Sequence, residues 1–294
     1  MMKNPFSIFD FLGYVFPGAF SLLSVFYFAI INPVEFCNPQ SLNELLVYVG
    51  DYITGSESVV SCTIFLILSY IAGHLIAYLS SITVEKFVIW WFGYPSEFLL
   101  KSDDKRWHFF HDGITMVKEK NYHFVREIIR TYTLRIIVSL LMFPVFLPTL
   151  LVKCLGCDNF FVKNLDPYLK DIILQKKNAL LKVLKLPDSS HYDKVDYHRV
   201  IYHYEYEHSS SHRTKMDNYV ALYDFLRSIT LIFSGIFMFI LGVGIFGASQ
   251  IGLYFWIDLA VLLFITYLSF MSFFKFYRRF TLEAFMCLVS DKDL

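Results

Sequence analysis

Charged side chains are scarce in this sequence. Asp, Glu, Lys and Arg make up 18% of the 294 residues, whereas soluble proteins average about 25%. The 26 basic residues equal the 26 acidic ones, so no excess of positive charge favours nucleic-acid binding, and we expect none. Glycine and proline are also few, at 13 and 9, which excludes a collagen-like or low-complexity chain. Five cysteines, an odd and scattered set, do not form a disulfide framework.

Hydrophobic residues, by contrast, reach 56% of the chain and gather in long runs. About 20 consecutive apolar residues are enough for a helix to cross a bilayer. Four runs meet this length: 11–31, 59–80, 226–246 and 251–273. They predict an all-α membrane protein in which two transmembrane helical hairpins, in residues 1–80 and 226–294, flank a mainly helical cytoplasmic domain, residues 81–225.

A fifth apolar run, residues 136–152, is shorter and contains Pro144 and Pro148. Residues 81–225 hold 20 of the 26 basic side chains and residues 33–57 hold none. Because basic segments next to spans are normally retained in the cytoplasm, we expect the fifth run to dip into the membrane and return, or to pack in the cytoplasmic domain. This topology predicts four spans with both termini cytoplasmic.

Two shorter patterns predict secondary structure in the middle segment. Asp166 and Pro167 are typical of a helix N-cap and first turn, and apolar residues at helical spacing predict a helix over 167–186. Its lysines could dock on anionic lipid, or its apolar face could pack inside the domain. Residues 202–206 alternate Tyr with polar side chains, the only convincing strand pattern in the chain.

Ionisable groups within apolar spans are costly in lipid and often functional. This criterion selects His74 in the second run, Arg227 at the start of the third and Asp258 in the fourth. Small residues can allow close contact between membrane helices, and Gly235, Gly242 and Gly244 are the candidates for that role.

The richest polar segment runs from residue 191 to 212 and contains five histidines. Side chains four residues apart on a helix can hold one metal ion, which makes His203, Glu207, His208 and His212 candidate metal ligands. The tyrosines between them favour a packed aromatic surface equally well. No catalytic residues and no cofactor are expected from the spacing of the motifs, so we expect no enzymatic activity.

Three short segments resemble a loose class of uncharacterised bacterial inner-membrane proteins with four spans. They are residues 9–18 (FDFLGYVFPG), residues 73–81 (GHLIAYLSS) and residues 277–280 (YRRF). Some members of that class lie beside antiphage defence genes.

The resemblance implies a bacterial inner-membrane location, with antiphage defence as the context. The few spans and their ionisable groups predict an oligomeric membrane effector or sensor, in contact with lipid and with other copies of itself. It would couple a cytoplasmic signal or a soluble partner to membrane perturbation. A scaffold that recruits a soluble partner and a metal-dependent membrane enzyme using residues 191–212 are the alternatives.

Overall fold

The computed structural model describes residues 10–30, 47, 58–100, 122–155, 165–185, 197–208, 210–247 and 252–291. Within these ranges the regular structure is helical and no strand occurs, which confirms the predicted all-helical fold. In chain order the helices are η1 (Phe11–Val15), α2 (Phe16–Ile30), α4 (Ser58–Ser80), η3 (Ser81–Glu85), α5 (Lys86–Phe92), α6 (Pro95–Leu100), α8 (Tyr122–Leu141), α9 (Phe143–Cys154), α10 (Pro167–Val183), α11 (Tyr197–His208), α12 (Ser210–Gly247) and α13 (Leu253–Ser290). The elements η1 and η3 are π-helical turns.

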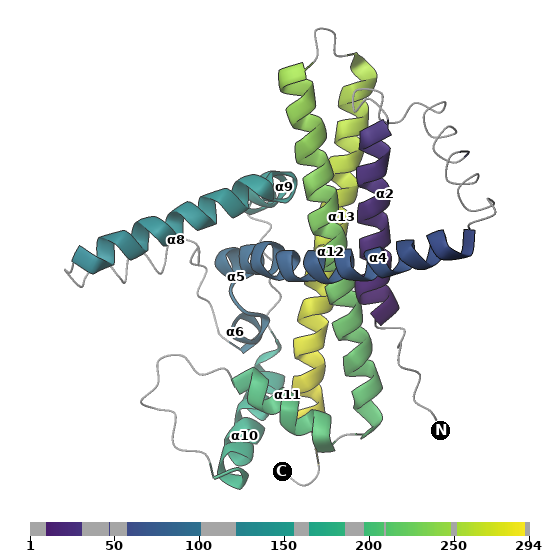
Figure 1. The fold of residues 1–294 in the computed structure, drawn as a ribbon. Helices are drawn as coiled ribbons and strands as arrows, with labels where there is room; N and C mark the ends of the chain where they lie inside the picture. Colours follow the sequence, from purple (N-terminus) through teal and green to yellow (C-terminus); the bar gives the residue numbers. More distant parts are fainter. Residues whose placement is uncertain are drawn as a thin grey trace. The chain divides into compact units, whose positions relative to one another are not determined.

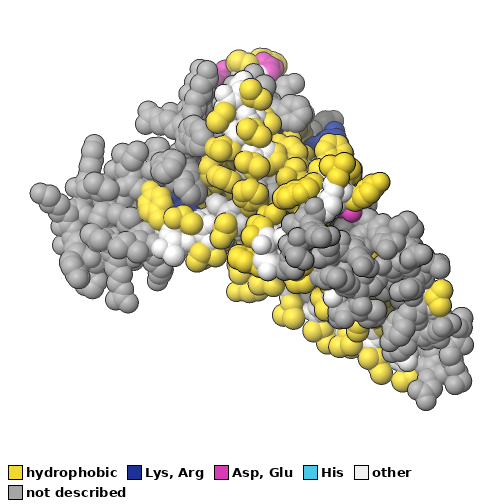
Figure 2. Space-filling view, turned by 90° about the horizontal axis from the view of Figure 1, so that it is seen from above, with side chains coloured by type: hydrophobic (Ala, Val, Ile, Leu, Met, Phe, Trp, Pro, Cys, Tyr) yellow, Lys and Arg dark blue, Asp and Glu magenta, His cyan; other side chains and the backbone are white. Residues whose placement is uncertain are grey.

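Four helical stretches are long and apolar enough to cross a membrane. They are Phe11–Phe28, Val59–Leu100, His212–Phe246 and Leu253–Ser290. On the face seen in Figure 2, most of the described side chains are hydrophobic. These features are consistent with the predicted membrane protein. The second, third and fourth stretches are longer than the predicted spans. In each of them the helix continues beyond the apolar run into a more polar segment.

The fifth apolar run is sharply bent, as its prolines suggested, but at a different residue. Helices α8 and α9 meet at an angle of 96°, and the break falls at Met142, before both prolines. Pro148 lies inside α9 and Pro144 is its second residue, so neither proline is at the bend. This bent pair could be a broken span or a re-entrant loop. The aromatic rings of Phe143 in α9 and Phe237 in α12 lie 6.5 Å apart.

The chain divides into two compact units that do not follow the three predicted segments. Unit 1 comprises Met1–Phe87, Glu119–Gly156 and Asp224–Phe273, and unit 2 comprises Val88–Lys118, Cys157–Tyr223 and Phe274–Leu294. The middle segment 81–225 is therefore shared between the units, and so is the C-terminal segment.

In unit 1, the apolar faces of α12 and α13 pack side by side (Figure 1). Their shared core contains Phe237 and Ile240 from α12, with Phe255, Leu259 and Leu262 from α13. Helix α4 also crosses α2 in this unit (Figure 1).

In unit 2, the predicted start of the helix over 167–186 is confirmed. The Asp166 side chain accepts a hydrogen bond from the Tyr168 N–H (3.2 Å), which caps α10. The helix ends at Val183, four residues before Pro187, and Lys185 adopts a positive φ of 51°. Ile173 and Leu180 are buried, so the apolar face of α10 packs within unit 2.

The strand expected over residues 202–206 is wrong, because these residues lie inside α11. Burial follows a helical period there, with Ile201 and Glu205 buried on one face. The ring of Tyr202 packs on Phe280 of α13, with 5.1 Å between ring centroids. Tertiary contact with α13 thus favours a helix over the alternation that the sequence suggests.

Candidate functional site

A buried cluster of charges surrounds Arg227, one of the three predicted intramembrane groups. The residue is 8% exposed. Its guanidinium donates from Nη1 to the Glu85 carboxylate and from Nε to Ser80 Oγ (3.1 Å). Nη2 lies 2.9 Å from Asp224 Oδ1 and also approaches the Ala77 carbonyl oxygen. One cation and two carboxylates give the cluster a formal charge of −1.

The π-helical turn η3 accounts for the position of Glu85 beside Ser80. In an α-helix, residues five apart point in directions that differ by about 140°. A π-helical turn instead closes hydrogen bonds between residues five apart and brings such residues toward one face. Ser80 immediately precedes η3 and Glu85 ends it, so both side chains reach Arg227. Turns of this kind frequently occur at functional sites.

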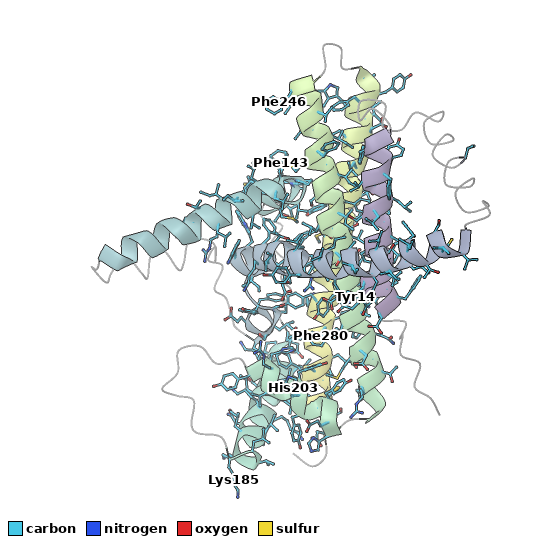
Figure 3. The ribbon with its side chains drawn as sticks, viewed as in Figure 1. Tyr14, Phe143, Lys185, His203, Phe246 and Phe280 are labelled. Carbon is cyan, nitrogen blue, oxygen red and sulfur yellow. The ribbon has the colours of Figure 1, made fainter. Side chains whose placement is uncertain are left out.

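His74 belongs to a second arrangement in unit 1, where α2 and α4 cross. Its ring stacks on Tyr14 of η1 with 4.0 Å between centroids, and Tyr70 meets it edge-on at 4.5 Å; Tyr14 is labelled in Figure 3. A Cβ at Gly18 would overlap the Ser69 carbonyl oxygen, and one at Gly73 would overlap the Tyr14 carbonyl oxygen. The two backbones therefore touch beside His74.

The third intramembrane group, Asp258, lies half-buried on α13.

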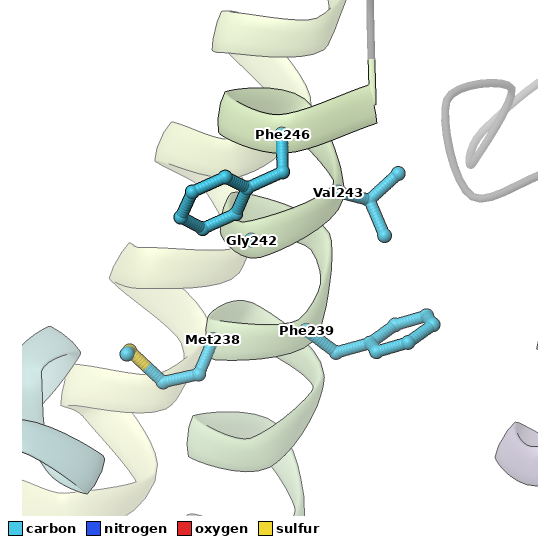
Figure 4. A pocket seen from close by; sticks show the side chains of 5 residues that line it. All are labelled: Met238, Phe239, Gly242, Val243 and Phe246. Carbon is cyan, nitrogen blue, oxygen red and sulfur yellow. The ribbon is translucent and has the colours of Figure 1, made fainter.

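Of the predicted packing glycines, Gly244 meets the Phe255 ring of α13. For Gly235 and Gly242, no described atom lies within 4 Å of an added Cβ. Gly242 is at the centre of a shallow apolar hollow in the surface of α12 (Figure 4), lined also by Met238, Phe239, Val243 and Phe246. Among these three glycines, only Gly244 therefore supports close helix packing within the chain.

In the described part of unit 2, no three of the four predicted metal ligands bring their donor atoms within 4.8 Å of one another. His203 is exposed on α11 and contacts the Tyr202 ring edge-on (Figure 3). Nδ1 of His208 lies 2.8 Å from the Tyr204 carbonyl oxygen, and its ring stacks on Tyr204. Glu207 is exposed on the same helix. His212 lies at the start of α12 and contacts a different helix, α13.

His212 forms a cluster with Glu283 and Cys287, two residues that the sequence reasoning missed. A ligand atom from each of the three lies within 4.8 Å of the others. Nδ1 of His212 is 3.1 Å from Glu283 Oε1, and Nζ of Lys215 is 2.7 Å from the same oxygen. Glu283 and Cys287 are four residues apart on α13, and both are buried.

Near this cluster, α11 carries a buried carboxylate, Glu205, that the sequence did not single out. The side chain is 1% exposed, and in the described part of the chain its Oε1 has no hydrogen-bond partner. Burial first, and then the negative charge of Asp291, raise the pKa of this carboxyl to about 7. Glu205 also interacts electrostatically with His212 and Cys287.

Comparison of the chain with protein-family models, with curated proteins and with solved structures finds no match. The basis for a functional proposal is therefore the chemistry of these two clusters and the helices that hold them.

Proposed function

We propose that this chain is a membrane sensor or effector that passes a signal along continuous helices to its membrane-spanning segments. The continuity of α12 and α13 carries this proposal. Each is a single helix of 38 residues, and each contains a boundary between the compact units, after Tyr223 in α12 and after Phe273 in α13. An unbroken helix transmits rotation or translation along its length. A ligand or soluble partner that binds unit 2 residues thereby acts on the apolar parts of both helices.

The Arg227 cluster gives such a movement two discrete end states. Arg227 is four residues after Tyr223 in α12, and it holds Ser80 at the end of α4 and Glu85 at the end of η3. A rotation of α12 that separates Arg227 from these groups leaves buried charges unpaired, which is unfavourable unless new partners replace them. The signal then selects between a paired and a rearranged state of the same helices.

The expected setting is a bacterial inner membrane, with antiphage defence as the context that the sequence resemblance favours. Retention of the basic residues of segment 81–225 in the cytoplasm supports an orientation with both termini inside. Four spans in one copy are few for a pore, so the active form is a homo-oligomer. His74, exposed beside its stack on Tyr14, is available to line a path where copies meet.

Membrane potential after induced expression tests this function. Wild type is expected to depolarise the membrane and arrest growth, and Glu85→Gln, which weakens the tie between η3 and α12, is expected to change both responses. His74→Ala is expected to reduce them. Lys275→Gln, at an exposed position on α13, is the matched control for loss of a charge. Equal potential and equal growth for wild type, Glu85→Gln and His74→Ala, at equal membrane insertion, would overturn the proposal.

A further inference from the structure

The cluster at the start of α12 combines three different donor atoms from two helices. His212 offers an imidazole nitrogen, Glu283 a carboxylate oxygen and Cys287 a sulfur, all within 4.8 Å of one another. This mixture of nitrogen, sulfur and oxygen ligands suits zinc and related divalent transition metals, and does not suit magnesium or calcium, which prefer oxygen alone.

A candidate fourth ligand lies on a third helix, outside the group of three close donor atoms. Glu205 on α11 is buried, has an unpartnered Oε1 in the described part of the chain, and interacts electrostatically with His212 and Cys287. A buried carboxylate oxygen that accepts no hydrogen bond, as Oε1 of Glu205 in the described part of the chain, is unfavourable in an apolar interior. A bound cation would balance the negative charge of Glu205. Such a cation would explain why a carboxylate is buried at this position, which packing alone does not.

We propose that His212, Glu283 and Cys287, completed by Glu205, bind one divalent transition-metal cation of the zinc class. By coordinating residues from α11, α12 and α13, the cation would link these three helices within unit 2. The thiol of Cys287 loses its proton on binding, and the sulfur becomes a thiolate ligand. This inference does not rest on the proposed membrane function.

Lys215 is the competing cation at this position. Its ammonium lies 2.7 Å from Glu283 Oε1, the same oxygen that faces His212. The Lys215 side chain is 53% exposed, so it can swing into solvent when a metal ion takes the carboxylate. Without metal, the ammonium of Lys215 balances the charge of Glu283, and the cluster is a simple ion pair.

Cobalt(II) binding to the purified full-length chain distinguishes these two descriptions. The chain is prepared with Cys37, Cys62, Cys154 and Cys157 changed to Ser, so that Cys287 is the only thiol. We expect one equivalent of Co²⁺ to produce a thiolate-to-cobalt charge-transfer band, and one equivalent of Zn²⁺ to displace it. Both metals are expected to raise the Tm measured in detergent.

Variants of the ligands identify the site. His212→Ala, at a partly exposed position, is expected to weaken Co²⁺ binding by at least about tenfold, the lower end of the effect of second-shell losses. Glu205→Gln is expected to weaken binding while keeping the thiolate band, and His203→Ala, exposed on α11, is expected to change neither. Cys287→Ser is expected to abolish the band.

Absence of the band in the single-thiol protein would overturn the proposal. An unchanged affinity of His212→Ala for Co²⁺ would also overturn it. This second test remains valid if Cys287→Ser fails to fold. Either result would leave the cluster as an ion pair between α12 and α13.

Discussion

In unit 1 the buried charge of the polar cluster is a cation, whereas in unit 2 it is a carboxylate. The Arg227 side chain is 10% exposed and its partners Glu85 and Asp224 are 26% and 29% exposed. In unit 2 the Glu283 side chain is 11% exposed, and its partners His212 and Lys215 are 35% and 53% exposed. Loss of a partner therefore leaves a different buried charge unpaired in each unit: the guanidinium of Arg227 in unit 1, and the carboxylate of Glu283 in unit 2.

Helices in unit 1 meet both through their backbones and through aromatic rings, such as Phe20 against Phe233. In unit 1, α2 and α4 meet backbone to backbone at Gly18 and Gly73. In unit 2, large rings fill the space between helices, as where His198 meets Phe280 and Phe285 of α13. Close backbone contact is typical of helices in lipid, where apolar side chains gain little by leaving one apolar surface for another.

The largest effect on stability is expected from Arg227→Gln. Removal of the guanidinium leaves Glu85 and Asp224 close together without a cation, and loss of one partner from a buried ion pair costs on the order of 3–5 kcal/mol. Arg227→Lys is expected to recover only part of this loss, because an ammonium cannot serve all the acceptors that the planar guanidinium reaches. Thermal unfolding in detergent measures both changes.

Arg279→Gln removes a cation from an exposed position on α13 and serves as the control. A Tm for Arg227→Gln within a degree of the control value would show that the burial of Arg227 has no energetic consequence. The contrast drawn between the two units would then fail.

The fold was largely predictable because its signals are local. Apolar runs of membrane length give the position of four spans, and Asp166 with Pro167 gives the start of α10. The helix limits were less predictable. The sequence of the run 59–80 does not predict that helix continues through η3 to Phe92. Ser81, Thr83 and Glu85 are acceptable both as a polar helix end and as a π-helical turn.

The sites were less predictable because their members are far apart in sequence. Arg227 was found from its position in an apolar run, but its partners Ser80 and Glu85 are 147 and 142 residues away. His212 was found among its neighbouring histidines, yet it pairs with Glu283, 71 residues away. The spacing of Asp224 and Arg227, and of Glu283 and Cys287, was the only local signal. Such i,i+3 and i,i+4 pairs also occur on ordinary helix surfaces.

An intermediate effect is expected from Gly18→Ala. The added methyl group would overlap the Ser69 carbonyl oxygen, and because the obstacle is backbone, α2 and α4 would have to separate. Overpacking of this kind costs about 1–3 kcal/mol. Gly235→Ala is the matched control on α12, since an added Cβ there meets no described atom within 4 Å, and alanine is the better helix former by up to about 1 kcal/mol. The Tm is expected to fall for Gly18→Ala and to hold or rise for Gly235→Ala; a fall of equal size in both would contradict the backbone contact.

The smallest effect is expected from Lys215→Met in unit 2. The ammonium is 2.7 Å from Glu283 Oε1 but half-exposed, and exposed ion pairs contribute only about 0–1 kcal/mol. Glu283 keeps a second polar partner, because Nδ1 of His212 lies 3.1 Å from its Oε1. The Tm is measured in the presence of a chelator. Glu283→Gln is measured for comparison, because it removes the buried charge that Lys215 and His212 both contact. A loss for Lys215→Met as large as that for Arg227→Gln would mean that Lys215 alone balances Glu283. The two clusters would then depend on their cations in the same way, despite the opposite burial of their charges.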